Sequence, residues 1–213
     1  MERLVMESQI SEMIFKVFSF AIGYLPGSIL TANPVARHYT GKSACEIGTK
    51  NPGMANIMMN VGKGAGILVL LGDIVKTAAA MLVSLLLFHE SIGIICIQYA
   101  ALGALFGHNF SLWNRFRGGK GVTVTCTWLI LAYKIPGILC CLAGAAAVFL
   151  TGWLPLGAAI IAVLSVPMAF FLYGYEAGIL VSISCVLMIF KNRKGLRRIL
   201  QGREERHLKL FGR

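Results

Sequence analysis

The stretch GAGILVLLGDIVKTAAAMLVSLLLF, residues 64–88, carries charge only at Asp73 and Lys76. An apolar run of about 18 residues or more is long enough to cross the hydrocarbon core of a bilayer as a helix. Ionisable groups inside such a helix are costly and usually face a site or one another. Residues three apart lie on one helical face. The stretch therefore predicts a transmembrane helix in which Asp73 and Lys76 can pair.

The rest of the chain has the same character. Hydrophobic residues make up 57% of the 213 residues and charged residues 14%, against about 25% charged residues in soluble domains. We therefore predict a single integral-membrane domain over residues 1–213, all-α and polytopic, with seven transmembrane helices. The seven apolar segments are Ile10–Leu30, Gly64–Phe88, Ile92–Phe110, Val122–Tyr133, Ile135–Leu150, Leu156–Tyr173 and Ala177–Phe190. Several of them are shorter than the roughly 20 residues that a helix perpendicular to the membrane needs to span it.

The positive charge is unevenly distributed. Nine of the twenty Lys and Arg residues lie in residues 191–213, most of the others lie in the first and third loops, and the second loop has none. Cytoplasmic loops of membrane proteins are enriched in Lys and Arg. We therefore expect the N-terminus outside, the C-terminus in the cytoplasm and residues 191–213 as a basic cytoplasmic helix or tail. Topology explains the net charge of +11 better than nucleic-acid binding does, although contact of the tail with anionic lipid or substrate stays open.

The cysteines form no metal-binding or disulfide pattern. There is no CxxC spacing and no nearby His cluster, and all but Cys45 lie within or beside apolar segments. Cysteine in such surroundings behaves as a small hydrophobe. No metal site is expected.

The first loop contains the polar run IGTKNPGMANIMMNVGKGAG, residues 47–66. Glycines let backbone N–H groups approach a ligand, Asn and Thr add neutral donors, and a following helix favours anions at its N-terminus. Asn-Pro-Gly alone is a turn signal, so a turn-rich connector is the alternative. It explains only part of so long a polar run.

The third loop, GHNFSLWNRFRGGKGVTV at residues 107–124, joins His108 and Asn109 to the glycines around Lys120. Glycines and a lysine directly before a helix favour a phosphate nest. The Walker A spacing is absent. The alternative is a positively charged cytoplasmic loop with glycines for a tight turn, and the loop by itself does not decide between them.

The C-terminal stretch FKNRKGLRRILQGREERH, residues 190–207, places Leu196, Ile199 and Leu200 on one helical face among many cations. This pattern is typical of an interfacial amphipathic helix. A basic stop-transfer anchor is the simpler alternative.

Together with YLPGSI at residues 24–29, these three stretches resemble the PlsY family of integral-membrane acylphosphate:glycerol-3-phosphate acyltransferases. The family pattern G-S-G-N-P-G-A-T-N-V-L-R-x-L-G-K appears as GTKNPGMANIMMNVGK. The pattern G-H-x-F-P followed by a phenylalanine, a basic residue and G-G-K-G-V appears as GHNFSLWNRFRGGKGV. The tail pattern H-R-E-N-I-x-R-L-L-x-G-x-E appears as NRKGLRRILQGREE.

The resemblance implies a multi-pass enzyme of the bacterial cell (inner or plasma) membrane with its active site on the cytoplasmic face. Such an enzyme transfers a fatty acyl group from acyl phosphate to the 1-hydroxyl of glycerol 3-phosphate, giving lysophosphatidic acid in phospholipid biosynthesis, without a cofactor or a metal. The implied catalytic residues are Thr49, Lys120 and Asn192. The implied substrate-binding residues are Ser28, Lys50, Asn51, Gly53, Asn56, His108, Asn109, Gly118, Gly119 and Gly121.

The chain departs from the family pattern at several of these places. Met59 stands where the family has a phosphate-binding arginine, Asn192 where it has a histidine, and Gly195 where it has an asparagine. Residues 155–158, PLGA, replace a serine-containing S-L-A-S stretch. Two alternatives therefore stay open, a divergent acyltransferase with another acceptor and a non-catalytic membrane protein that binds lipid or a partner.

Overall fold

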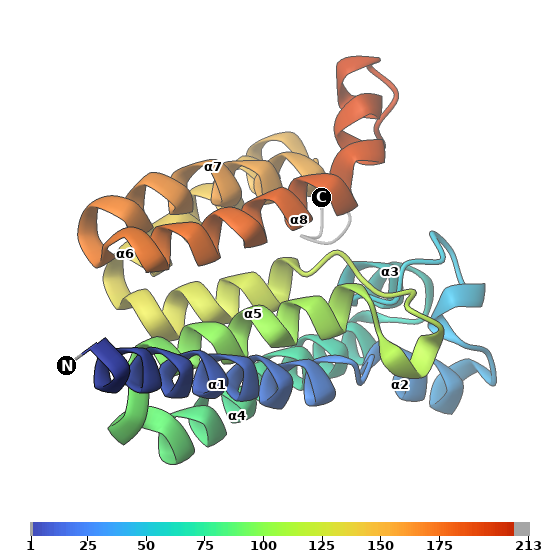
Figure 1. Ribbon diagram of the computed structural model, residues 1–213. Helices are drawn as coiled ribbons and strands as arrows, with labels where there is room; N and C mark the ends of the chain where they lie inside the picture. Colours follow the sequence, from blue (N-terminus) through green and yellow to red (C-terminus); the bar gives the residue numbers. More distant parts are fainter. Residues whose placement is uncertain (1, 207–213) are drawn as a thin grey trace.

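The computed structural model describes residues 2–206, and all regular structure among them is helical (Figure 1). Residues 207–213 of the predicted basic tail lie outside the described part. The helices are α1 (Glu2–Gly27), α2 (Ala32–Thr40), η1 (Ala44–Glu46), α3 (Met54–Asn60), α4 (Lys63–Ile92), α5 (Ile95–Asn109), η2 (Leu112–Asn114), α6 (Val122–Thr151), α7 (Leu154–Tyr173) and α8 (Tyr175–Leu200).

The long helices form a bundle in which small residues allow close packing. Helix α1 lies against α4 and α5, and α7 lies between α6 and α8. A Cβ atom added at Gly23 of α1 would overlap the carbonyl of Ala100 in α5, and one added at Gly103 would overlap the carbonyl of Phe20. Helices in a membrane associate through such backbone contacts, because lipid supplies no hydrophobic driving force between them.

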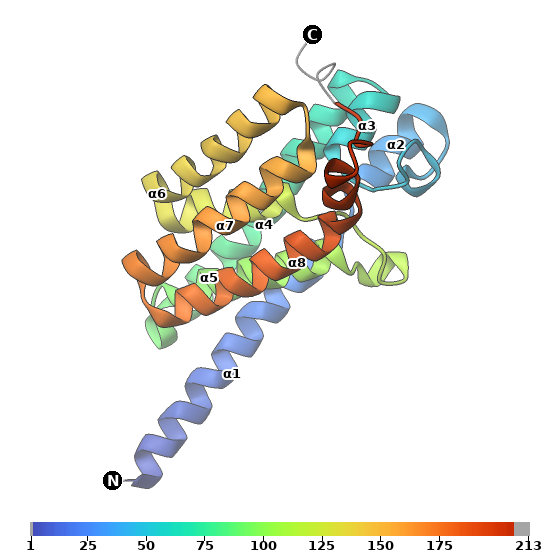
Figure 2. The same ribbon diagram turned by 90° about the horizontal axis from the view of Figure 1, so that it is seen from above.

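Helix α6 consists of two antiparallel arms. Lys134 has φ 51° and ψ −124°, which is not helical, and the chain reverses there (Figures 1 and 2). Cys141 Sγ lies 3.9 Å from the carbonyl oxygen of Cys126, whereas a straight helix would separate two residues 15 apart by about 22 Å. Residues 122–133 and 135–151 are therefore separate arms, at the boundary that the apolar segments predicted.

The prediction of an all-helical membrane protein is confirmed. Five helical stretches among the described residues are long and apolar enough to cross a membrane, namely 5–40, 63–92, 122–151, 154–173 and 175–200. Helix α5 has only 15 residues, and the two arms of α6 count here as one stretch. Seven spans and the orientation of the termini stay predictions.

The polar loops gather at one end of the bundle, which we call the site end. Helices α2 and α3 and the C-terminal part of α8 lie there, and the N-terminus lies at the opposite end (Figures 1 and 2). The third loop joins this group because Asn114 Nδ2 contacts Cys45 Sγ of the first loop at 3.6 Å. Three stretches far apart in the sequence thus meet at the site end.

Candidate active site

A cavity of about 760 Å³ opens at the site end and has two chemically different parts. We call them the polar chamber and the apolar limb. The apolar limb lies between the two arms of α6 and α7, and it is lined by Val122, Cys126, Cys141, Gly144, Ala145, Val148, Leu154, Gly157, Ala158 and Ile161. The polar chamber is lined by Asn51, Asn56, Asp73, His108, Lys120, Lys191, Asn192, Lys194, Arg198, Arg203, Glu204 and Glu205.

The third loop brings Lys120 to the start of α6. Gly121 is the N-cap of α6 with φ 79°, a left-handed conformation that glycine adopts without strain. Gly121, Val122 and Thr123 line the cavity, so the free N–H groups of the first turn of α6 lie at its wall. Burial lowers the pKa of Lys120, partly offset by the nearby Glu204 carboxylate. This arrangement of ammonium and helix N-terminus suits a phosphate.

Gly118 and Gly119 have a packing role in this loop. Gly119 N–H donates to the carbonyl of His108 at 3.0 Å. A Cβ at Gly118 would overlap that carbonyl, and one at Gly119 would overlap His108 Nε2. Neither glycine lines the cavity. Their absence of side chains lets the loop lie directly on the end of α5, which positions Lys120.

A buried polar network supports His108. Lys76 Nζ lies 2.8 Å from Asp73 Oδ1 and 3.1 Å from His108 Nδ1, and it donates to the carbonyl of Ile29 at 2.9 Å. Thr31 Oγ1 donates to Asp73 Oδ1 at 2.5 Å. The predicted Asp73–Lys76 pair is therefore confirmed. Since an ammonium can only donate, His108 Nδ1 accepts and the ring proton sits on Nε2, the side toward Gly119.

Asn56 organises the first loop. Its Nδ2 donates to the carbonyls of Ala44 and Ile47 at 3.3 and 3.0 Å, and its Oδ1 accepts from Thr49 N–H at 2.9 Å. This side chain is 2% exposed. The amide thus fixes the loop that carries Thr49 and Asn51, which line the cavity with Gly53.

The end of α8 forms a wall of the cavity. Lys191, Lys194, Gly195 and Arg198 all line it, because residues three and four apart share a helical face. Arg198 Nε pairs with Glu204 Oε2 at 2.5 Å, so residues 201–206 fold back onto the helix. The stretch is therefore more than a stop-transfer anchor. These cations are not among the predicted site residues, although their helical spacing is visible in the sequence.

The positions that depart from the family pattern also meet at the cavity. Asn192 is 2% exposed and its Nδ2 donates to the Met188 carbonyl at 2.9 Å. Met59 lies on the wall and is 38% exposed. A Cβ at Gly195 would overlap Pro155 Cγ, so these two departures are in direct contact.

Three other predicted substrate-binding residues do not line the cavity. Ser28 is buried and its hydroxyl donates to the Tyr24 carbonyl at 2.8 Å. Lys50 is exposed, with φ 57°. Asn109 is buried, its carbonyl accepts from Lys191 Nζ, and its side-chain amide has no partner among the described residues. Within residues 2–206 no group of three or more His, Cys, Asp or Glu residues could hold a metal ion.

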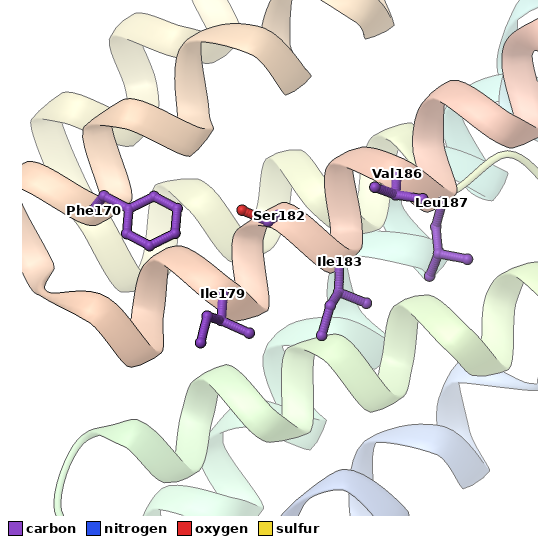
Figure 3. A pocket seen from close by; sticks show the side chains of 6 residues that line it. All are labelled: Phe170, Ile179, Ser182, Ile183, Val186 and Leu187. Atoms are coloured by element: carbon purple, nitrogen blue, oxygen red, sulfur yellow. The ribbon is translucent and has the colours of Figure 1, made fainter.

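A second hollow lies on the outer side of the bundle between α7 and α8. It has a volume of about 430 Å³ and is lined by Phe170, Ile179, Ser182, Ile183, Val186 and Leu187 (Figure 3). The lining contains no cation, so this groove offers nothing to a phosphate. The polar chamber is the better candidate for a phosphate-binding site.

Comparison with known proteins identifies the family of this chain. The family described as glycerol-3-phosphate acyltransferase matches residues 17–202. The chain belongs to this family. It is 33% identical over 188 residues to glycerol-3-phosphate acyltransferase 1 of Lactobacillus johnsonii, covering 88% of this chain and 90% of that protein. It is 32% identical over 191 residues to the glycerol-3-phosphate acyltransferase of Nitrobacter winogradskyi. That alignment covers 89% of this chain and 95% of that protein.

Solved structures share the fold. The crystal structure of PlsY (YgiH), an integral membrane glycerol 3-phosphate acyltransferase, in its glycerol 3-phosphate form superposes with a TM-score of 0.80 at 23% identity, covering 90% of this chain and 94% of that chain. The lysophosphatidic acid form superposes with a TM-score of 0.80 at 22% sequence identity, covering 93% of this chain and 99% of that chain. The resemblance to the PlsY family is therefore confirmed, and this chain is a membrane enzyme of the acyltransferase class.

Proposed function

We propose that the protein transfers a fatty acyl group from acyl phosphate to the 1-hydroxyl of glycerol 3-phosphate and releases lysophosphatidic acid. One observation carries the proposal. A single cavity joins a polar chamber rich in cations to an apolar limb between helices. A fatty acyl phosphate has the same two halves, an anionic head and an apolar chain. The family to which the chain belongs supplies the reaction class.

The acyl donor fits the cavity in one direction. Its phosphate lies at Lys120 and the N-terminus of α6, where an ammonium and free backbone N–H groups are together. Its chain extends into the apolar limb past Gly144 and Gly157. The acceptor phosphate lies against the cations of α8, Lys194 and Arg198, which line the same cavity.

The reaction needs positioning and charge stabilisation more than a protein nucleophile. The 1-hydroxyl oxygen forms a bond to the acyl carbonyl carbon, and the bond from that carbon to the phosphate oxygen breaks. The hydroxyl proton ends on the departing phosphate, so the atoms balance without a cofactor. Holding both substrates in one cavity makes the step effectively unimolecular, and cations at the phosphate stabilise the charge on the leaving group.

The remaining predicted residues have these proposed roles. Thr49 offers a hydroxyl at the mouth of the cavity, and Asn192 orients the acceptor as a neutral amide in place of a titratable group. Asn51 and Gly53 line the same mouth. Asn56, Gly118 and Gly119 act by positioning the two loops.

We further propose seven spans, formed by α1, α4, α5, the two arms of α6, α7 and α8. The reversal at Lys134 supports counting α6 twice. The basic loops at the site end favour its placement in the cytoplasm and the N-terminus outside. In a bacterial inner membrane this topology opens the cavity toward the cytoplasm.

The test is an assay of the purified protein in lipid nanodiscs with palmitoyl phosphate and glycerol 3-phosphate. We expect lysophosphatidic acid from the wild type, a large loss in Lys120→Ala, and wild-type activity in Lys42→Ala, whose side chain is exposed and away from the cavity. Donor consumption that does not depend on glycerol 3-phosphate would indicate another acceptor. Folded protein that consumes neither substrate would contradict the proposal and favour a binding role.

A further inference from the structure

Two cysteines face each other across the hairpin of α6. The two arms are in close contact near the turn, where a Cβ at Gly137 would overlap the carbonyl of Leu129. Cys126 lies three residues before Leu129 and Cys141 lies four residues after Gly137, so each is one helical turn further from the reversal. The contact of Cys141 Sγ with the Cys126 carbonyl oxygen at 3.9 Å shows that this register holds.

The pair forms the floor of the apolar limb. Farther from the reversal, Val122 on one arm and Gly144 and Ala145 on the other also line the limb. Of the six cysteines, all in the described part, only Cys126 and Cys141 line the cavity. The neighbouring Cys140 is 6% exposed and does not line it, because one residue turns the side chain about 100° around a helix.

We propose that Cys126 and Cys141 are an oxidisable thiol pair that a hydroperoxide converts into a disulfide at the floor of the apolar limb. One thiol attacks the peroxide, giving a sulfenic acid and an alcohol or water. The second thiol attacks the sulfenic sulfur, the S–S bond forms and water leaves. The two thiols lose two electrons and two protons in total, and the hydroperoxide accepts both. Its source is hydrogen peroxide or an oxidised unsaturated acyl chain, which the limb would admit.

The disulfide would join the two arms about two helical turns from the reversal at Lys134. This consequence rests on the proposed function, since an acyl chain that occupies the limb needs the arms free to separate at the floor. The oxidised protein would then turn over long-chain acyl phosphate more slowly than the reduced protein. A thiol reductant would restore the rate.

The test treats the full-length protein in nanodiscs with hydrogen peroxide and maps its cysteines by mass spectrometry of proteolytic peptides. We expect a Cys126–Cys141 disulfide in the wild type and in Cys140→Ser. The matched control is Cys141→Ser, in which Cys140, next to position 141, is the nearest cysteine in sequence that could pair with Cys126. We expect no Cys126–Cys140 link in that variant, because the Cys140 side chain points away from the limb.

Two results would overturn the proposal. One is the absence of the Cys126–Cys141 link while the accessible Cys45 becomes oxidised, which would show that peroxide was present but the pair did not react. The other is equal linking of Cys126 to Cys140 in Cys141→Ser, which would mean that the arms have no fixed register. Peptide mapping does not depend on acyl transfer. A link in a protein that makes no lysophosphatidic acid when reduced would therefore count against the proposed function alone.

Discussion

Lys120 should contribute measurably to binding of the acyl phosphate, and its deprotonation should determine the pH above which kcat/KM falls. A hydrogen bond to a charged group contributes about 1.5–3 kcal/mol. At about 1.36 kcal/mol per tenfold change in rate, Lys120→Ala should lower kcat/KM for the acyl phosphate by roughly 10- to 150-fold. The half-buried position of the side chain at the helix N-terminus makes this contact difficult for water to replace.

The pH dependence follows from the direction of the pKa shift. Burial lowers the pKa of Lys120 below its ordinary value, so in the free enzyme the ammonium loses its proton earlier as the pH rises. The account requires the charged form to bind phosphate. The value of kcat/KM should therefore fall on the alkaline side, below the ordinary lysine pKa of about 10.4. Bound phosphate favours the ammonium, so kcat should fall at a higher pH than kcat/KM does.

The assay is lysophosphatidic acid formation in nanodiscs across the neutral to alkaline range. Lys120→Arg stays charged throughout, because the guanidinium pKa exceeds about 12, so its alkaline fall should move to higher pH even if its kcat/KM is reduced. The reasoning is refuted if Lys120→Ala keeps the wild-type kcat/KM, or if Lys120→Arg shows the same alkaline fall as the wild type.

The remaining predictions concern packing and the departures from the family pattern. Gly119→Ala should lower both the melting temperature and kcat/KM, because overpacking against His108 costs about 1–3 kcal/mol. The control is Gly64→Ala, because nothing lies within 4 Å of its Cβ position. Equal effects of the two substitutions would argue against the close contact at Gly119. Gly195→Asn should destabilise the protein, because the new side chain would overlap Pro155 Cγ. In a double-mutant cycle of melting temperatures, Pro155→Ala should recover part of that loss. Additive effects would show that the two positions do not interact. Met59→Arg, at the cavity wall, should lower the KM for glycerol 3-phosphate without raising kcat, and an unchanged KM would place the acceptor phosphate elsewhere.

Much of the architecture could be predicted because it depends on local properties of the chain. The apolar run of 64–88 predicts a transmembrane helix. Asp73 and Lys76, three residues apart, predict a pair, which the structure confirms at 2.8 Å. The break between residues 133 and 135 was also visible, since Lys134 and Pro136 interrupt the apolar pattern at the reversal. These features need no knowledge of what packs against them.

The division of roles within the site could not be predicted from the sequence. Gly118 and Gly119 suggested a ligand contact, yet the structure places them against the end of α5. Asn56 suggested a substrate donor, yet its amide holds the first loop. Such roles depend on which backbone lies opposite each residue, and that is fixed by packing between segments far apart in the sequence. The fold-back of residues 201–206 involves the pairing of Arg198 with Glu204, six residues apart, which the helical pattern of the sequence does not indicate.

The central claim is that one cavity holds the phosphate in its polar chamber and the acyl chain in its apolar limb. The most direct measurement is photocrosslinking with a nonhydrolysable acyl phosphonate that carries a diazirine near the end of its chain, followed by mapping of the labelled residues. The account predicts labels on the two arms of α6 and on α7, around Cys126, Cys141 and Ile161. It also predicts loss of those labels in Lys120→Ala. Labels confined to the outer groove at Phe170 and Ile183 would contradict it.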